Sequence, residues 1–202
     1  MGLKKKINIE NLKENTAVSE AREKLRAART RGIVKWVFEI IVTLVFALLV
    51  AISAFQTVTL QESAMEPTYS VSEKFFVNRA LYKVSSPKRG DVIVFKTSAS
   101  DSAALHIRRV IGLPGETVQV KDGKIYINGK VYEENGAYQD MTDGGLANSA
   151  ITLESGEYFV LGDNRNNSED SRFSDIGNIS KKYIVGKVWF TVSPKNKIGF
   201  IK

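Results

Sequence analysis

Residues with reactive or charged side chains gather in three separate stretches of this 202-residue sequence. The first, Gln61–Thr68, reads Gln-Glu-Ser-Ala-Met-Glu-Pro-Thr and contains a single serine hydroxyl, that of Ser63. The second contains the only histidine, His106, two residues before Arg108. The third, residues 162–172, reads Gly-Asp-Asn-Arg-Asn-Asn-Ser-Glu-Asp-Ser-Arg. A serine becomes a nucleophile only when a general base removes its proton, so these stretches raise the question of hydrolytic chemistry.

The third stretch also contains oxygen ligands in an order that suggests a calcium loop. Asp163 and Asn167 occupy ligand positions of such a loop, but Ser168 replaces the required glycine and Ser174 replaces the terminal bidentate glutamate. An EF-hand is therefore excluded, and the alternative is a turn held by side-chain to backbone hydrogen bonds. The sequence has no cysteine, which excludes thiolate metal sites and disulfides. We expect neither a metal nor a cofactor.

The charge of the chain is unevenly distributed. Lysine and arginine total 29 against 22 aspartate and glutamate residues, for a net charge of +7. Residues 1–35 contain ten basic and four acidic side chains, which leaves 19 basic and 18 acidic side chains for residues 36–202. A nucleic-acid-binding domain normally carries its excess positive charge on its folded part. The distribution therefore argues against nucleic acid as a partner.

An apolar segment follows the basic N-terminal region. Residues 36–55 are apolar apart from Glu39 and two hydroxyl side chains, and about twenty such residues span a bilayer as a helix. Because the flanking basic residues lie on the N-terminal side, the positive-inside rule predicts an uncleaved membrane anchor with a cytoplasmic N-terminus and an extracytoplasmic domain from residue 56. We expect residues 1–35 to be a cytoplasmic segment, helical over 17–29, which is either solvated or in contact with lipid headgroups.

Beyond Thr57 the pattern is that of short β-strands separated by turns. Residues typical of strands cluster at 75–77, 91–95, 106–111, 118–120, 125–127, 131–132, 158–161 and 184–191. Asp122-Gly123 and Asn128-Gly129 are typical of the type I′ turns of β-hairpins. Residues 134–149 are rich in Gly, Asn and Asp and are expected to form a long loop. The sequence predicts one mainly β domain over residues 56–202.

Three segments, in this order after a single anchor, resemble the bacterial type I signal peptidases. These are membrane-anchored serine endopeptidases that remove signal peptides from exported preproteins. The segments are Met65–Thr68, Arg109–Glu116 and Gly162–Arg172, and the likeness extends over residues from about 36 to 192. The resemblance implies a mainly β fold: a single N-terminal transmembrane helix followed by a signal-peptidase-like extracytoplasmic β domain.

The resemblance also implies a Ser–Lys catalytic dyad. The family's serine stands immediately before the Met of Met-x-Pro-Thr, and its lysine immediately before the Arg-Val-Ile-Gly-Leu-Pro-Gly segment. Those positions hold Ala64 and Arg108 here. Alanine has no nucleophilic atom, and arginine keeps its proton at neutral pH whereas a buried lysine can lose it. We expect the chain to be an inactive peptidase. A buried Arg108 guanidinium also requires an anionic partner, for which Glu62 and Asp170 are the candidates.

Further residues take supporting roles by resemblance. The hydroxyl of Ser168 orients the lysine, and Asp170 and Arg172 form an ion pair that shapes the loop beside the site. Gly162 and Asp163 belong to the same supporting loop.

Ser63 and His106 form the alternative catalytic pair. Ser63 adjoins Ala64, but in an extended segment its side chain would point to the opposite side. His106 shares a strand face with Arg108 if that strand is regular. The alternative for His106 is a solvent-facing strand residue near a loop.

The resemblance implies that signal peptides bind extended along a strand edge, with small residues in shallow apolar pockets. Ser63, Met65 and Pro67 would line that cleft, and the backbone N–H of residue 64 would belong to an oxyanion hole. Two origins explain Ala64: an introduced Ser-to-Ala change in a peptidase, or a non-catalytic relative of the kind that assists assembly of surface structures such as pili. Arg108 argues against an introduced Ser-to-Ala change as the whole explanation, because one substitution is enough to inactivate the peptidase.

Overall fold

The chain forms two compact units in a computed structural model that describes residues 2–100 and 102–201. The first unit is Met1–Ile52 and the second, the β unit, is Ser53–Lys202. The model describes the backbone alone for residues 2–17, 19–21, 25, 27 and 28.

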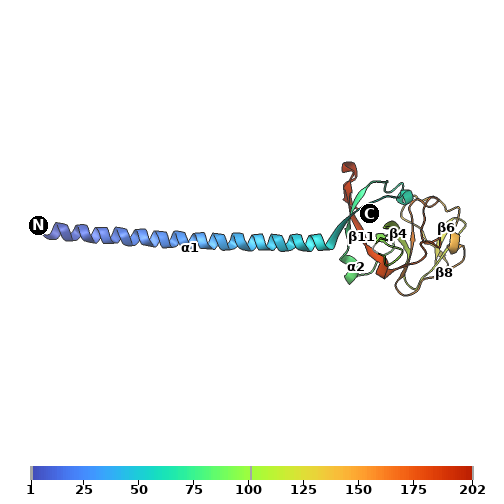
Figure 1. The fold of residues 1–202 in the computed structure, drawn as a ribbon, viewed down its shortest axis with the longest axis horizontal. Coiled ribbons are helices and arrows are strands. Elements are labelled where there is room, and N and C mark those ends of the chain that lie inside the picture. The colour runs from blue at the N-terminus through green and yellow to red at the C-terminus, as the bar shows by residue number, and fades with distance from the viewer. Residues whose placement is uncertain (1, 101, 202) are drawn as a thin grey trace. The chain divides into compact units, whose positions relative to one another are not determined.

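One helix, α1 (Gly2–Ala54), runs through the first unit (Figure 1). No proline precedes Pro67, so no residue removes a backbone donor along this helix. The helix predicted for residues 17–29 is part of it. Within α1, Arg22–Ala54 is long and apolar enough to cross a membrane by length and composition, which makes it a candidate span. The helix ends at Ala54, one residue before the predicted end of the span.

The β unit contains two antiparallel sheets, and the larger one carries the motifs. Its strands follow the order β1-β2-β11-β3-β4-β9-β10, with β12 paired to β11. In Figure 1, β11 and α2 (Leu81–Val84) lie toward one end of the unit and β6 and β8 toward the other. The strands of this sheet are β1 (Phe55–Thr59), β2 (Lys74–Asn78), β3 (Val92–Phe95), β4 (His106–Gly112), β9 (Glu157–Leu161), β10 (Ile179–Ser180), β11 (Ile184–Ser193) and β12 (Gly199–Phe200).

The smaller sheet has the strand order β7-β6-β5-β8. Its two hairpins turn at the predicted dipeptides: φ is 50° and 77° at Asp122 and Gly123, and 51° and 77° at Asn128 and Gly129. Positive φ at both central residues is the type I′ geometry, so these predictions are confirmed. The strands are β5 (Thr117–Lys121), β6 (Lys124–Ile127), β7 (Lys130–Val131) and β8 (Ile151–Thr152).

The larger sheet is covered on both faces by apolar side chains. All four residues of β3 are buried. Val92 and Val94 pack in one hydrophobic cluster, while Ile93 and Phe95 pack in another. This division follows because successive side chains of a strand point to opposite faces. A third cluster joins Leu161 of β9 to Val118 of β5 and so packs the two sheets together.

The predicted mainly β fold is confirmed, and each predicted strand has its counterpart. The expected loop over residues 134–149 is irregular except for a 3-10 turn, η2 (Gly145–Asn148). The sequence pattern did not indicate β1, β8, β10 or β12. Of these, β8, β10 and β12 have two residues each, too few for a periodicity to show. Strand β1 follows the apolar helix without a break, which masked it.

Candidate active site

The first motif forms a 3-10 turn, η1 (Ser63–Met65), and not an extended segment. The predicted opposite orientation of residues 63 and 64 assumed an extended chain and is wrong, since both residues line one cavity. Met65 is fully buried in the hydrophobic core, and its carbonyl accepts a hydrogen bond from the amide of Tyr69 at 2.9 Å. Burial of the Met65 side chain thereby anchors the turn and leaves Ala64 at the cavity.

Hydrogen bonds join the first motif to the third across about a hundred residues of sequence. The amide of Asn164 donates to the carbonyl of Ala64 at 3.0 Å, and its side-chain nitrogen donates to the carbonyl of Ser63 at 3.2 Å. The side chain of Asn167 donates to the Ser63 hydroxyl at 3.3 Å. Asn164 was not singled out in the sequence, and Asn167 only as a ligand position of the excluded calcium loop, although residues of this type commonly bond neighbouring backbone in turns.

Arg108 is buried beside Ala64 and its guanidinium has three partners. Strand β4 places Arg108 in the sheet interior, where its side chain is 1% exposed. Nη2 lies 2.6 Å from Glu62 Oε2, Nε donates to the Glu169 carbonyl at 2.8 Å and Nη1 donates to the Ile107 carbonyl at 2.8 Å. Of the two candidate partners, Glu62 pairs with Arg108. The guanidinium is thus held in one orientation by groups from both sides of the cavity.

Glu62 also contacts His106. Oε1 of Glu62 lies 2.9 Å from His106 Nδ1, so one carboxylate meets the two strand residues that share a face of β4. Burial opposes the charged form of Glu62, but the close contact with His106 and the charge of Arg108 outweigh it and lower the pKa of Glu62 to about 2. The carboxylate is therefore ionised at neutral pH.

The expectation of a solvent-facing His106 is wrong. Its side chain is 14% exposed and stacks on the ring of Phe95 with 5.7 Å between centroids. The two residues are partners in the β3–β4 register, and cross-strand partners lie close enough to pack. Among the described residues, no hydrogen bond joins His106 to Ser63.

Ser168 lies in the wall of the site with its hydroxyl buried and without a hydrogen-bond partner in the described part of the chain. It packs against Gly162. A Cβ on Gly162 would lie 2.1 Å from Ser168 Oγ and 2.5 Å from the carbonyl oxygen of Ala64. Only glycine allows this close approach of the third motif to the first.

Asp170 and Arg172 form the expected ion pair, and both are buried. Arg172 Nε and Nη2 donate to the carboxylate at 2.8 and 2.9 Å, and the Gly162 amide donates to the same carboxylate at 3.1 Å. Arg172 also donates to the carbonyls of Asp143 and Arg165. Asp170 is thereby committed to Arg172 and does not pair with Arg108.

A second buried ion pair joins the second and third motifs. Asp163 accepts two hydrogen bonds from Arg109, at 2.8 and 2.7 Å, and its side chain is 0% exposed. Burial opposes the charge on Arg109, but the hydrogen bonds and charge of Asp163 raise its pKa above the ordinary value. Beside this pair Arg165 binds Glu134 through two nitrogens and lies over the ring of Tyr138.

These elements enclose a cavity of about 570 Å³. Ser63 lines it, but Met65 and Pro67, which were expected to line the same cleft, do not. Met65 turns into the core, and Pro67 is exposed and lines a separate cavity of about 650 Å³. The residues that line the cavity at Ala64 are Glu62, Ser63, Ala64, Arg108, Asn166, Asn167, Ser168, Glu169, Phe173 and Asp175. The described residues contain no group of three or more His, Asp or Glu side chains placed to hold a metal ion.

Comparisons with known proteins agree with this arrangement. Residues 33–193 match a family described as signal peptidase, peptidase S26. Signal peptidase I of Bacillus licheniformis is 33% identical over 177 residues, which cover 84% of this chain and 94% of that protein. Signal peptidase I T of Bacillus subtilis strain 168 is 33% identical over 183 residues, covering 87% and 93%. A crystal structure of a signal peptidase I from Enterococcus faecalis V583 shows 32% identity and a TM-score of 0.42, covering 52% of this chain and 98% of that one.

The family match spans most of the chain, and the relatives align along nearly their whole length. The mainly β unit accords with that match, and so does the cavity that residues 62–64, 108 and 166–169 share. This chain belongs to the signal peptidase family, peptidase S26, a family of serine peptidases.

Proposed function

We propose that this chain is a membrane-anchored signal peptidase homologue that binds signal-peptide segments and does not cleave them as it stands. The observation that carries the proposal is the buried Arg108, paired with Glu62 beside Ala64. The position of the family's base is thus filled by a group that cannot accept a proton, and the position of the nucleophile by a methyl group.

The geometry around Arg108 supports loss of the base. A general base must reach the proton that it removes, within about 3 Å. The three guanidinium nitrogens of Arg108 instead donate to Glu62, Glu169 and Ile107. The hydroxyl of Ser168, which would orient a lysine, has no partner among the described residues. Ser168, the supporting residue, is therefore present, whereas the lysine that its hydroxyl would orient is replaced by Arg108.

The Ser63–His106 pair does not supply a substitute. The Ser63 hydroxyl accepts a hydrogen bond from Asn167, and His106, which does not line the cavity, has its Nδ1 against Glu62. A nucleophile and its base need a direct hydrogen bond, or one that tightens on substrate binding. We propose that His106 holds Glu62 in place for Arg108.

The binding half of a peptidase site is compatible with both substitutions. Alanine retains the backbone N–H that an oxyanion hole uses, and the hydrogen bonds of Asn164 hold the turn that carries Ala64. An extended signal peptide would add to a strand edge beside the cavity, with small side chains next to Ala64. Backbone bonds would supply affinity, and the size of the pocket would supply selectivity.

We propose the topology that the charge pattern predicts. Residues 1–35 would lie in the cytoplasm, 36–55 would cross the cell membrane and the β unit would lie outside. Trp36 to Ala54 within α1 satisfies the length needed for a span, and the flanking positive charges precede it in the sequence. The site would then face exported preproteins at the outer surface.

A second candidate is a non-catalytic role in assembling surface structures such as pili. The observation that favours it is the complete set of partners for Arg108. A buried guanidinium needs such partners in any case, and with all of them present Arg108 is a structural part of the site, as a non-catalytic role of this position would require.

Cleavage of a preprotein in liposomes tests the proposal with three full-length chains. They are the chain as given, Ala64→Ser, and Ala64→Ser with Arg108→Lys. We expect no processing by the first, little by the second and recovery in the third, because only the third has both a nucleophile and a titratable base. Ala64→Thr with Arg108→Lys serves as the matched control, since it adds a hydroxyl with an extra methyl group in a buried position.

Processing by the chain as given would contradict the proposal. Failure of the third chain, with its thermal unfolding unchanged, would favour the assembly role. Photo-crosslinking of a signal peptide to the chain as given separates binding from cleavage. We expect labelling that an excess of unlabelled signal peptide abolishes.

A further inference from the structure

A second cavity of the β unit lies away from the candidate active site. It has a volume of about 890 Å³ and shares no lining residue with the cavity at Ala64. Strands β1 and β11, helix α2, the segment after β3 and the 3-10 turn Lys181–Tyr183 all contribute to it. Its lining residues are Gln56, Arg79, Tyr82, Lys83, Lys96, Ser98, Ala99, Ala103, Leu105, Lys181, Lys182, Tyr183, Ile184 and Val185.

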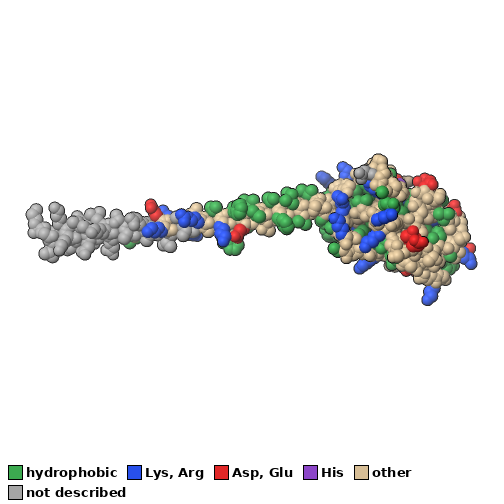
Figure 2. Space-filling model, turned by 60° about the horizontal axis from the view of Figure 1, so that its bottom comes forward, with side chains coloured by type: hydrophobic (Ala, Val, Ile, Leu, Met, Phe, Trp, Pro, Cys, Tyr) green, Lys and Arg blue, Asp and Glu red, His purple; other side chains and the backbone are tan. Residues whose placement is uncertain are grey.

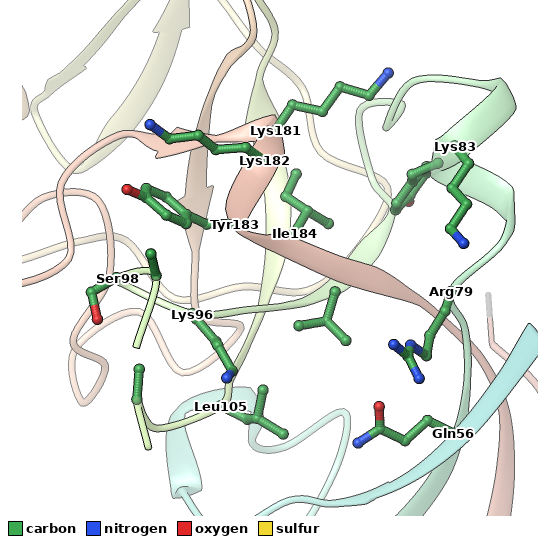
Figure 3. Close-up of a pocket in the computed structure, with 14 residues that line it drawn as sticks. Gln56, Arg79, Lys83, Lys96, Ser98, Leu105, Lys181, Lys182, Tyr183 and Ile184 are labelled. Carbon is green, nitrogen blue, oxygen red and sulfur yellow. The ribbon is translucent and has the colours of Figure 1, made fainter. Parts of the chain in front are cut away.

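Five cationic side chains line this cavity, and no described lining residue is acidic. The cations are Arg79, Lys83, Lys96, Lys181 and Lys182. Figure 3 shows Arg79 and Lys83 on one side, Lys96 across from Arg79, and Lys181 and Lys182 along a third side. Figure 2 shows Lys and Arg side chains gathered on this unit's surface. Like charges that line one cavity repel one another, and an anion bound between them would relieve this repulsion.

Four of these cations, Arg79, Lys83, Lys181 and Lys182, form no ion pair with a described carboxylate. Lys181 Nζ donates to the carbonyl of Ser85 at 2.8 Å, and Lys182 lies over the ring of Tyr183. Both partners are neutral. Among the described residues, no carboxylate forms an ion pair with Arg79 or Lys83. The cavity therefore offers an anion several donors whose charge the described carboxylates do not neutralise.

The chain places this cavity close to the end of the candidate membrane span. The amide of Arg79 donates to the carbonyl of Ala54, the last residue of α1, at 2.8 Å. Phe55 pairs with Asn78 in the β1–β2 register, and Gln56, the next residue of β1, lines the cavity. A strand advances about 3.3 Å per residue. The cavity thus begins within two residues of the point where an apolar helix would leave the bilayer.

Aromatic side chains at the same strand support this position. The ring of Phe55 lies 5.3 Å from that of Trp189, and Trp189 lies 5.2 Å from Phe200. Trp189 and Phe200 are 41% and 66% exposed. Tryptophan is enriched where a protein meets the headgroup layer, and the two phenylalanines add apolar surface beside Trp189. Val84, next to Lys83 in α2, is 88% exposed and adds to the apolar surface beside the cavity.

We propose that this cavity, defined by Arg79, Lys83, Lys96, Lys181 and Lys182, binds the phosphate headgroup of an anionic phospholipid. A phosphodiester brings one negative charge and several acceptor oxygens, which match lysine and arginine donors. The acyl chains would extend toward the exposed aromatic side chains. A bound lipid would fix the height of the β unit over the bilayer, and it acts independently of the chemistry at Ala64.

Native mass spectrometry of the full chain in detergent tests the proposal. The probes are phosphatidylglycerol, which is anionic, and phosphatidylcholine, which is zwitterionic with the same acyl chains. We expect retention of one phosphatidylglycerol at concentrations at least tenfold lower than for phosphatidylcholine. Each cation near an anionic headgroup contributes about fivefold. Arg79→Ala with Lys83→Ala and Lys182→Ala should therefore weaken retention on the order of a hundredfold.

The matched control is Lys121→Ala with Lys124→Ala and Lys130→Ala, which removes the same charge from exposed positions of the smaller sheet. It should leave retention unchanged within about twofold. A second variant keeps the positive charge at the same three positions: Arg79→Lys with Lys83→Arg and Lys182→Arg. It should still bind phosphatidylglycerol. The test therefore does not depend on the alanine variant alone, which a folding defect could weaken.

Three results would overturn the proposal. The first is equal retention of the two lipids, and the second is equal weakening by the cavity variant and its control. The third is displacement of phosphatidylglycerol by inorganic phosphate at similar concentration, which would assign the cavity to a soluble phosphate instead of a lipid.

Discussion

The carboxylate of Glu62 lies 2.6 Å from the guanidinium of Arg108, a contact between residues 46 positions apart that closes the candidate site from one side. Arg108 is 1% exposed while Glu62 is 36% exposed at the side chain. One member of the pair is therefore buried and the other is partly in solvent. The carboxylate of Glu62 neutralises the guanidinium that strand β4 places in the interior. Its energetic role and that of its neighbours can be measured.

The first prediction concerns the coupling between these two residues. Removing one partner of a buried polar contact leaves the other unsatisfied, at a cost of about 1–3 kcal/mol. We expect Glu62→Gln to destabilise the folded state by this amount, and to have little effect once Arg108 is replaced by methionine. A double-mutant cycle by chemical denaturation measures the coupling. A coupling energy below about 0.3 kcal/mol would show that the contact is not energetically significant.

The second prediction concerns acid stability. The close contact with His106 and the charge of Arg108 overcome burial and lower the pKa of Glu62 from 4.5 to about 2. The folded state then binds fewer protons than the unfolded state, so this stabilisation is complete above about pH 4.5 and is lost as the pH falls toward 2. Allowing for solvent screening of the exposed carboxylate, the loss is about 1–2 kcal/mol.

Unfolding midpoints between pH 2 and pH 6 measure this dependence. Glu62→Gln should flatten it, whereas Glu154→Gln, at an exposed position, should leave it as in the parent chain. An unchanged profile in Glu62→Gln would assign the acid sensitivity to other carboxylates.

The third prediction concerns Gly162. A Cβ there would lie 2.1 Å from Ser168 Oγ and 2.5 Å from the carbonyl oxygen of Ala64. We expect Gly162→Ala to destabilise the unit by more than about 2 kcal/mol, because the two motifs must separate. Gly199→Ala is the matched control, since a Cβ at Gly199 meets nothing within 4 Å. Equal thermal unfolding of the two variants would mean that the loop relaxes freely.

The fourth prediction concerns Ser168. Its buried hydroxyl has no hydrogen-bond partner among the described residues, so removing it costs no bond. We expect Ser168→Ala to be neutral within about 0.5 kcal/mol, or slightly stabilising. In the chain with Ala64→Ser and Arg108→Lys, the same change should lower cleavage at least tenfold, because the lysine loses its orienting group. Full cleavage without this hydroxyl would remove Ser168 from the supporting residues.

The fifth prediction concerns the Asp163–Arg109 pair. Both side chains are buried, and two hydrogen bonds join them. We expect Asp163→Asn to destabilise the folded state by about 3–5 kcal/mol, since it leaves a buried cation uncompensated. Chemical denaturation measures the change, with Asp140→Asn at an exposed position as the control. A loss below about 1 kcal/mol would indicate that water replaces the carboxylate.

The sequence alone predicted much of the fold because the local signals agree with the tertiary structure. The run Val92–Phe95 and the turns Asp122-Gly123 and Asn128-Gly129 carry their own geometry: apolar strand residues and residues that tolerate positive φ. The sequence also determined that residue 64 has no nucleophilic atom and that residue 108 cannot act as a base, since these are properties of the side chains themselves.

Only the tertiary structure decided which groups meet. Asp170 and Glu62 were equal candidates for Arg108, and the choice depended on Arg172 occupying Asp170 and on a 3-10 turn at Ser63–Met65. The half-buried position of His106 depended on its cross-strand partner Phe95. These contacts join residues far apart in the sequence, so no local pattern encodes them; they are set when β3, β4 and β9 pair and the apolar side chains pack around them.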